Sequence, residues 1–323
     1  VNAKPHIGHA LEYVQTDAIA RYQRLLGKDV FFLSGTDENS LKNVRAAEKA
    51  GMSVKKFVDE HYIYFHNFKD YLNISFDDFI RTTEERHFAG AQKLWGLFKP
   101  EDIYKKKYKG LYCVGCETFY KEDELEDGKC PEHKREPEVV EEENWFFKLS
   151  NYQNKLKKLV EKGELKIVPE IKKNEWLAFI NRGLDDFSIS RSKERAHGWG
   201  VPVPGDEEQI MYVWVDALIN YYSATQFLKG KEKFWPADVH IIGKDITWFH
   251  TVIWQALLIA AGIKLPQAIL SHGFFTIDGQ KISKSLGNVI NPLELLDKYQ
   301  TDSIRYSLLR CSVFEDSEYS EEI

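Results

Sequence analysis

Two histidines near the start of the chain, His6 and His9, are spaced to bind an anion. Pro5 disfavours the α-helical conformation for Lys4, whereas apolar residues recur with helical spacing after residue 9, so a helix is predicted to begin at His9. The free N–H groups and the positive end of a helix start attract negative charge, and imidazoles can donate protons to it. The stretch VNAKPHIGH therefore predicts a phosphate site, although such a motif on its own is more often a loop with surface histidines.

A second anion-binding candidate lies near the other end of the chain, in DGQKISKSLGN at residues 278–288. Lys281 and Lys284 supply two cations, and Gly279 and Gly287 are candidate hinges for the loop that carries them. Alone, this stretch is typical of a solvated basic loop. Its chemistry complements that of the two histidines, because both stretches could meet the charge of one phosphate chain.

Four residues in the middle of the chain have the spacing of a zinc site. Two residues separate Cys113 from Cys116, and Cys130 and His133 form a second pair after a gap of thirteen residues. Three thiolates and one imidazole complete a tetrahedral Zn²⁺ site and leave no open position for water, so the zinc is predicted to be structural. A disulfide is the competing interpretation, which is disfavoured because Cys311 stands alone and the chain is expected to be cytosolic.

Asp37 is a candidate ligand for the ammonium group of a substrate. Gly27 ends the first predicted helix, and residues 29–34 (DVFFLS) form a predicted buried strand. Asp37 follows the carboxyl end of this strand, which is where open α/β sheets bind ligands. The alternative role for Asp37 is to cap a helix.

Further ligand-binding edges are predicted after residue 197, where strand and helix signals return. The helix predicted first places Trp214, Ala217, Leu218 and Tyr221 on one side. The strand that follows ends in a turn from Gly243 to Asp245, which is a second candidate edge. The predicted elements are a helix over 211–227, a strand over 238–245, a helix over 246–261 and a strand over 268–275.

These elements predict an α/β protein with a doubly wound parallel (Rossmann-like) sheet that is interrupted by a zinc-bearing connective insertion. The chain has 323 residues, 43% of them apolar, so two domains are expected. Residues 101–170 are rich in Lys and Glu and lack strand-helix alternation. The predicted divisions are residues 1–99 and 198–276 for the two halves of the catalytic domain, 100–197 for the insertion, and 277–323 for the KISKS loop with a helical stem-contact segment.

The charge balance excludes a broad nucleic-acid-binding surface. The chain has 44 Lys and Arg against 50 Asp and Glu, a net charge of −6, so any RNA contact must be local. The most apolar predicted helix, residues 249–262, is too short and too polar to span a bilayer, so a cytoplasmic protein without membrane association is expected. The chain begins at Val1, just before a motif that should follow a strand, so a preceding strand is expected to be missing from the amino end.

Together, the motifs resemble the HIGH and KMSKS signatures of class I aminoacyl-tRNA synthetases. Across nearly the whole chain, the more specific resemblance is to the catalytic domain and connective insertion of methionyl-tRNA synthetases. Leucine, isoleucine and valine enzymes usually carry a much longer editing insertion than the roughly hundred residues available here. The resemblance rests on NAKPHIGHA, FFLSGTDEN, DDFIRTTEERH, YCVGC with CPEH, DDFSISR, YVWVDALINYYSA, HIIGKDITWFH, KISKSLGN and RYSLLR.

This resemblance implies activation of L-methionine with Mg²⁺-ATP to methionyl-adenylate, transfer of methionine to tRNA(Met), and one structural Zn²⁺. The implied catalytic residues are His6, His9, Lys281 and Lys284, which also bind ATP together with Gly8, Gly243 and Asp245. The implied methionine contacts are Asp37, Arg191, Trp214, Ala217, Tyr221, Ile246 and His250. The implied metal ligands are Cys113, Cys116, Cys130 and His133.

Three features depart from the family pattern. Asn39 and Ser40 stand where relatives often have His-Gly, which leaves this pair without an implied role. Ile282 replaces the Met of KMSKS and leaves both lysines in place. The chain ends at Ile323, where the family continues into a helical anticodon-binding domain, so this fragment is expected to activate methionine and to bind tRNA poorly. The alternatives are a class I synthetase for another apolar amino acid and a catalytically silent, zinc-stabilised tRNA-binding scaffold.

Overall fold

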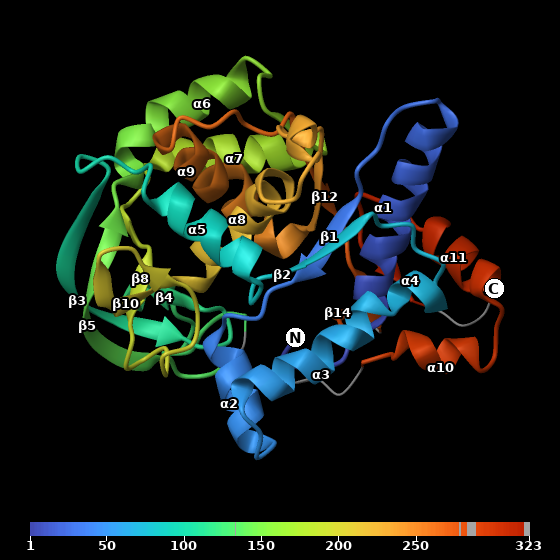
Figure 1. Ribbon diagram of the computed structural model, residues 1–323, viewed down its shortest axis with the longest axis horizontal. Coiled ribbons are helices and arrows are strands. Elements are labelled where there is room, and N and C mark those ends of the chain that lie inside the picture. Colours follow the sequence, from blue (N-terminus) through green and yellow to red (C-terminus); the bar gives the residue numbers. More distant parts are fainter. Residues whose placement is uncertain (133, 278, 283–288, 320–323) are drawn as a thin grey trace.

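Two groups of parallel strands form the centre of the computed structural model, which describes residues 1–132, 134–277, 279–282 and 289–319 (Figure 1). The described strands confirm a parallel α/β core. They form two sheets rather than one doubly wound sheet, because no ladder among them joins β1 to β11. One sheet pairs β1 (Leu33–Thr36) with β2 (Asp78–Arg81), and the other has β12 (Ala268–His272) between β11 (His240–Gly243) and β6 (Lys166–Val168).

Side chains cap the starts of three helices in the first third of the chain. Helix α1 (Ile7–Leu25) starts two residues before the predicted His9, because the His6 side chain is itself the cap and accepts a hydrogen bond from the Gly8 N–H. Ser40 and Ser53 cap the next two helices in the same way. The other bounds are α2 (Leu41–Lys49), α3 (Val54–His66), α4 (Phe68–Tyr71) and α5 (Glu85–Trp95).

The middle of the chain forms two antiparallel sheets, with strand orders β4-β3-β5-β7 and β8-β10-β9. The long β3–β5 ladder runs from Ile103 opposite Phe147 to Tyr112 opposite Glu138 and ends beside the first cysteine pair. The bounds are β3 (Ile103–Cys113), β4 (Thr118–Tyr120), β5 (Glu138–Phe147), β7 (Phe187–Ser188), β8 (Ser190–Ser192), β9 (Pro202–Val203) and β10 (Asp206–Met211), with short 3₁₀ turns η1 (Glu122–Glu124) and η2 (Leu149–Tyr152).

Two strand pairings join the predicted insertion, residues 100–197, to the segment that follows it. Strand β6, between α6 (Gln153–Glu161) and α7 (Glu170–Arg182), pairs with β12 of the parallel sheet, and Ile167 packs in one buried cluster with Ile242 and Ile269. Strands β9 and β10 follow residue 197 but form a sheet with β8. These pairings do not follow the predicted divisions, because distant apolar partners, which local periodicity does not reveal, decide them.

Helices α5 and α8 (Val213–Gln226) pack together over the largest core cluster, in which Leu218 and Trp254 are fully buried. The helix predicted over 246–261 is present, but it is not a regular α-helix. It consists of a 3₁₀ turn η4 (Lys244–Ile246), a π-helical turn η5 (Phe249–Ile253) and α9 (Trp254–Ala260), and the Gln255 side chain donates to the His250 carbonyl (2.8 Å). Single π turns occur frequently at functional sites. A further 3₁₀ turn, η3 (Glu232–Phe234), precedes β11.

The last segment of the chain packs against the first helix. Helix α11 lies beside α1 (Figure 1), and its Ile304 and Leu308 share a buried cluster with Ile7. The buried Asp17 carboxylate accepts a hydrogen bond from Arg305 (2.6 Å), which ties the two helices together. The remaining bounds are β13 (Phe275–Ile277), β14 (Gln280–Lys281), β15 (Ser317–Glu318), α10 (Pro292–Leu296) and α11 (Thr301–Leu309).

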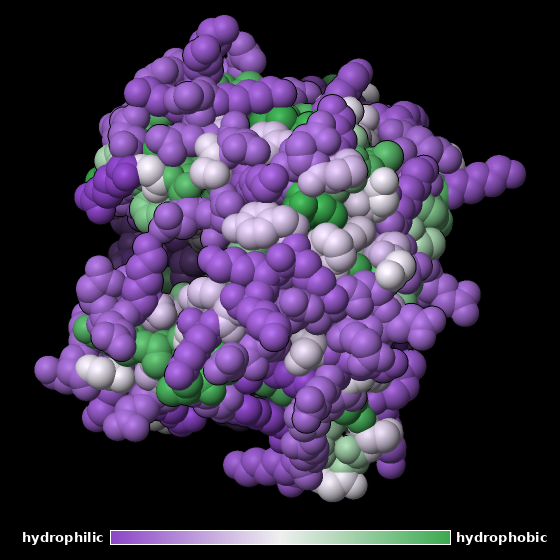
Figure 2. Space-filling view, turned by 90° about the vertical axis from the view of Figure 1, so that its left-hand side faces the viewer, coloured by the Kyte–Doolittle hydropathy of each residue, from purple (hydrophilic) through white to green (hydrophobic). Residues whose placement is uncertain are grey.

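Apolar side chains are concentrated in the interior, and the face shown in Figure 2 is mainly hydrophilic, with small scattered apolar groups. Within the described ranges, no helix combines the length and the apolar composition that crossing a membrane would require.

Candidate active site

The two histidines of the first motif lie together at the start of α1. The Nδ1 atom of His6 accepts from the Gly8 N–H (3.1 Å), the Nδ1 atom of His9 accepts from the His6 N–H (3.1 Å), and the ring centroids are 4.0 Å apart. A neutral imidazole that accepts at Nδ1 carries its proton on Nε2, so each ring can donate a hydrogen bond there. Gly8 is required for this arrangement, because a Cβ atom at residue 8 would lie 2.9 Å from Cε1 of His6.

The described ends of the lysine loop connect it to this histidine turn. Lys281 pairs with Thr276 in the β13–β14 hairpin, and the Ile7 N–H donates to the Ile290 carbonyl (3.0 Å) directly after the loop. Ile282 is buried in the apolar cluster that contains Ile7. Lys284 and the side chain of Lys281 lie outside the described residues. The fold therefore brings the two ends of the predicted lysine loop to the first turn of α1.

The turn after β11 carries Gly243 and Asp245 at the carboxyl end of the parallel sheet, as the sequence predicts. A Cβ atom at Gly243 would lie 3.2 Å from the Phe274 ring and 3.0 Å from Oδ1 of Asp245, so glycine permits the close approach of the two strand ends. Lys244, between them, is paired with Asp316 (2.6 Å).

Glu12 and His272 also meet at this edge, and the sequence analysis missed both. His272 directs Nε2 to the Glu12 carboxylate (3.0 Å) and Nδ1 to the Gly273 carbonyl (2.7 Å). Although burial acts against it, the hydrogen bond and the charge of Glu12 raise the pKa of His272 above its usual value. Two signals could have identified the pair: Glu12 lies three residues after His9 on one helix face, and His272 ends a parallel strand.

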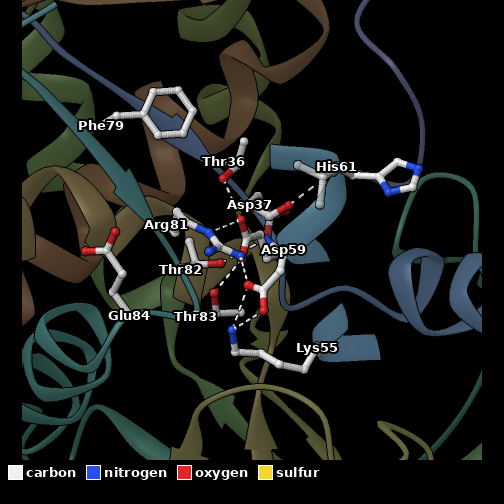
Figure 3. A network of polar contacts seen from close by, with 12 residues as sticks. Thr36, Asp37, Lys55, Asp59, His61, Phe79, Arg81, Thr82, Thr83 and Glu84 are labelled. Atoms are coloured by element: carbon white, nitrogen blue, oxygen red, sulfur yellow. Dashed lines mark hydrogen bonds and ion pairs between the residues drawn. The ribbon is translucent and has the colours of Figure 1, made fainter. Parts of the chain in front are cut away.

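The loop after β1 holds Asp37 between two buried side chains. The fully buried Glu38 carboxylate accepts from Arg81 Nε (2.8 Å) and Nη2 (2.9 Å) and from the Thr36 hydroxyl (2.7 Å). Arg81 also pairs with Asp59 of α3 (2.7 Å), and Figure 3 shows these groups converging beside the Asp37 loop. Asp37 itself is solvent-exposed. The loop therefore holds Asp37 on a backbone that is fixed by its buried neighbours.

The charges around Asp37 make ionisation of its carboxyl group unfavourable. Partial desolvation by the surrounding protein, followed by the carboxylates of Glu117 and Asp216, raises the pKa of Asp37 to about 8. The cation of Lys42 acts in the opposite direction. A site with excess negative charge and a perturbed carboxyl group is suited to a cationic ligand.

The predicted side-chain contacts of α8 line up on its half-buried face. Trp214, Ala217 and Tyr221 are each partly accessible, whereas Leu218, on the same predicted side, belongs to the core. The Trp214 ring stacks on Phe249 of the π turn with a centroid distance of 3.9 Å and an interplanar angle of 8°. These residues form an aromatic wall that extends from α8 to η5.

A polar pair at the inner end of this wall fixes the orientation of His250. Its Nδ1 faces the Ile246 carbonyl (3.0 Å), which can only accept, so Nδ1 carries the proton and Nε2 accepts from the Tyr221 hydroxyl (2.8 Å). Burial lowers the pKa of His250 to about 4 and that of the neighbouring His240 to about 3, so both rings are neutral at pH 7. The wall is therefore aromatic and uncharged.

The described contacts of Arg191 are with the insertion and with Tyr212, and its place in the methionine site stays a prediction. Its guanidinium donates to the Ser190 carbonyl (2.7 Å) and the Ser188 hydroxyl (2.9 Å) and lies 4.1 Å from the centre of the Tyr212 ring. Tyr212 is the residue that precedes α8. Among the described contacts none joins Arg191 to Asp37, because strand β8 directs the arginine onto an aromatic cluster of the insertion.

Three of the four predicted metal ligands converge. The sulfur atoms of Cys113, Cys116 and Cys130 all lie within 4.8 Å of one another, and those of Cys116 and Cys130 are 3.3 Å apart. This separation excludes a disulfide in this structure and suits thiolates that share one ion with Zn–S bonds of about 2.3 Å. Burial raises the pKa of the Cys116 thiol, so a metal ion would be needed to hold it as a thiolate. His133 lies outside the described residues.

The family model that matches the chain is described as "tRNA synthetases class I (M)", and it matches residues 1–136 and 123–322. Among curated proteins, the chain is 46% identical to a methionine–tRNA ligase of Thermotoga maritima, in an alignment that covers 100% of this chain and 52% of the relative. It is also 46% identical to that of Brucella suis, with 99% and 64% covered.

Solved structures show the same similarity. Mycobacterium tuberculosis methionyl-tRNA synthetase bound by methionyl-adenylate matches with a TM-score of 0.94 and 43% identity, over 99% of this chain and 65% of that one. The apo form of the same enzyme matches with a TM-score of 0.82. The chain spans about half to two-thirds of the length of these relatives.

Proposed function

The chain belongs to the methionine-type family of class I tRNA synthetases, and we propose that it activates L-methionine with Mg²⁺-ATP and transfers the methionyl group to tRNA(Met). The observation that carries this proposal is how three elements lie around the parallel strands: the Asp37 loop follows β1, the helix of the histidine turn contacts β11, and α8, which carries the aromatic wall, contacts β2. The adenylate-bound relative supports it, since its fold matches this chain over 99% of its length.

The proposed first step joins the methionine carboxylate to the α-phosphorus of ATP in line with the departing pyrophosphate. No covalent enzyme intermediate is required, so the chain contributes by positioning and by stabilising charge. His6 and His9 would donate from Nε2 to phosphate oxygens, because each Nδ1 already accepts a backbone N–H. Lys281 and Lys284 are proposed from the sequence alone to meet the triphosphate.

Gly8, Gly243 and Asp245 are proposed to contact the nucleotide. Gly8 brings the backbone close to the His6 ring, and Gly243 lies at the carboxyl end of β11, next to the Glu12–His272 pair. Open α/β sheets bind nucleotides at this edge. We propose on the same grounds that the two parallel sheets act as halves of one doubly wound core around α1, which contacts β11.

The amino-acid site is proposed to combine Asp37 with the aromatic wall. The exposed Asp37 carboxylate would pair with the substrate ammonium, and Trp214, Ala217, Tyr221, Ile246 and His250 would enclose the thioether. A sulfur atom near an aromatic ring gains about 0.3 to 1.5 kcal/mol, and neutral His250 places no charge beside it. Arg191 would support this site through Tyr212 and the start of α8 rather than by touching the ligand.

The cysteine cluster fits a structural zinc ion. Cys113, Cys116 and Cys130 would hold it, with His133 as the proposed fourth ligand, and a closed four-ligand site supplies folding energy rather than catalysis.

The test is methionine-dependent exchange of pyrophosphate into ATP, compared with norleucine, leucine and isoleucine as substrates. We expect methionine to give the highest kcat/KM, and norleucine and leucine to be poor but detectable substrates, since an apolar pocket discriminates by about 1–3 kcal/mol per methylene. Preference for leucine or isoleucine would indicate a synthetase for another amino acid. No exchange with any of them would indicate a catalytically silent scaffold.

A further inference from the structure

A fully buried polar network lies directly behind the Asp37 loop. The Asn39 side-chain amide donates to Asp216 Oδ2 of α8 (2.8 Å) and to the Thr82 carbonyl after β2 (2.9 Å). The other Asp216 oxygen is hydrogen-bonded to Nε2 of His87 in α5 (2.5 Å), and Nδ1 of His87 is hydrogen-bonded to the Ser223 hydroxyl (2.9 Å). The side chains of Asp216 and His87 have no exposed area. The network joins three elements that are distant in the sequence.

The orientation of Asn39 follows from its neighbours. The Thr82 carbonyl and the Asp216 carboxylate are both acceptors, so only the NH₂ end of the Asn39 amide can face them. An alanine at residue 39 would leave both acceptors buried without this donor, which is costly for a carboxylate. Asn39 therefore fixes the distance between the loop after β1 and helix α8.

Asp37 lies two residues before this anchor, and the residue between them is anchored as well. The Glu38 N–H donates to the Thr82 hydroxyl (2.9 Å), and its carbonyl accepts from the Asn43 amide (2.9 Å) and the Trp199 indole (2.8 Å). Because the backbone of Glu38 is held at both its N–H and its carbonyl, the position of the adjacent Asp37 is restricted as well.

Helix α8 carries the side-chain wall of the proposed amino-acid site and is bonded to the Asp37 loop. Trp214, Ala217 and Tyr221 line its accessible face, and Asp216, between the first two, faces the buried interior. A bond from Asp216 to the Asp37 loop therefore links the part that would hold the ammonium group to the part that would hold the side chain.

We propose that Asp216 is a positioning residue for the amino-acid site, which acts through Asn39 to hold the Asp37 carboxylate at a fixed distance from the side-chain wall of α8. This inference rests on the proposed function, because it assigns Asp37 to the substrate ammonium. It also gives Asn39, which has no role implied by the family pattern, a defined part in the site.

The charge of Asp216 provides a readout that a purely structural role would not change. Among the groups that act on the Asp37 carboxyl are Asp216 of α8, Glu117 beside the cysteine cluster and Lys42 of α2. Of these, Asp216 and Glu117 raise the pKa of Asp37, and Lys42 lowers it. Removing the negative charge of Asp216 should therefore let Asp37 ionise at lower pH.

The experiment measures methionine KM, ATP KM and kcat by pyrophosphate exchange at several pH values for two variants. Asn39→Ala should raise methionine KM about tenfold or more, with ATP KM within about twofold, because only the amino-acid site is misplaced. Asp216→Asn is nearly isosteric, so this variant should fold. Its profile of methionine KM against pH should move to lower pH by about half a unit, because a negative charge near Asp37 is lost and solvent weakens the effect of that charge.

Ser223→Ala is the matched control, since it removes one buried hydrogen bond from His87 at the end of the network far from the loop. It should leave methionine KM within about twofold. The inference is overturned if Ser223→Ala raises methionine KM as much as Asn39→Ala does, or if Asp216→Asn leaves the pH profile unchanged. A wild-type protein without methionine-dependent exchange would overturn the proposed function and this inference together, whereas active wild type with unaffected variants would overturn this inference alone.

Discussion

Methionine affinity should depend steeply on pH below neutrality, because an ammonium group pairs with Asp37 only when that carboxyl is ionised. Partial desolvation and the nearby carboxylates raise the pKa of Asp37 to about 8 in the free protein. At pH 7 about one molecule in ten then has Asp37 ionised, and at pH 6 about one in a hundred. The apparent dissociation constant for methionine should therefore rise about tenfold from pH 7 to pH 6 and level off above about pH 8.5.

Isothermal titration calorimetry in two buffers of different ionisation enthalpy measures both the affinity and the protons exchanged. Close to one proton should be released per methionine bound at pH 6 to 7, since binding ionises Asp37. Asp37→Asn should bind methionine weakly and without this proton release. An affinity that is constant from pH 6 to pH 8 in the wild type would refute the assignment of Asp37 to the ammonium group.

The raised pKa of Asp37 also predicts that the free energy of unfolding decreases as pH rises, whereas methionine affinity increases. The pKa of Asp37 is higher in the folded protein than its ordinary value of 3.8, so folding favours the protonated form, and stability falls as pH rises from about 4 to about 8. Asp37→Asn removes that cost. Its melting temperature at pH 8, measured without ligand, should equal or exceed that of the wild type, and a clear decrease would contradict the pKa argument.

Other predictions concern the metal, the helix anchor and the side-chain wall. Cys130→Ser should lower the zinc content below one equivalent and lower the melting temperature, and native protein without zinc would exclude the site. Asp17→Ala should lower the free energy of unfolding in urea by about 3 kcal/mol, because Arg305 loses its buried partner. Burial acts to raise the pKa of Asp17, but hydrogen bonds from Ser75 and the arginines outweigh it and lower that pKa. The stabilisation by Asp17 should therefore be present above about pH 4 and be lost on further acidification. Tyr221→Phe removes the donor to Nε2 of His250 and should raise methionine KM about tenfold with little change in ATP KM.

The residues that could do chemistry, and the turns and helix starts that hold them, can be predicted from the sequence. Cys113 ends β3, and Cys116 lies in the turn that follows with two residues between them, so their spacing alone predicts sulfur atoms that face one ion. The cap of α1 is likewise local, since His6, Gly8 and His9 bond within four residues of one another. Interactions at such short separation follow from backbone geometry, which periodicity and proline or glycine signals reveal.

Which distant groups meet depends on how the chain packs in three dimensions. His272 and Glu12 are 260 residues apart, and Asn39 and Asp216 are 177 apart, so no local pattern could pair them. Arg191 was directed onto aromatic rings by the register of β8 against β10, which the sequence does not specify. In each case a buried polar group takes the partner that packing supplies, because leaving it without one costs about 1–3 kcal/mol.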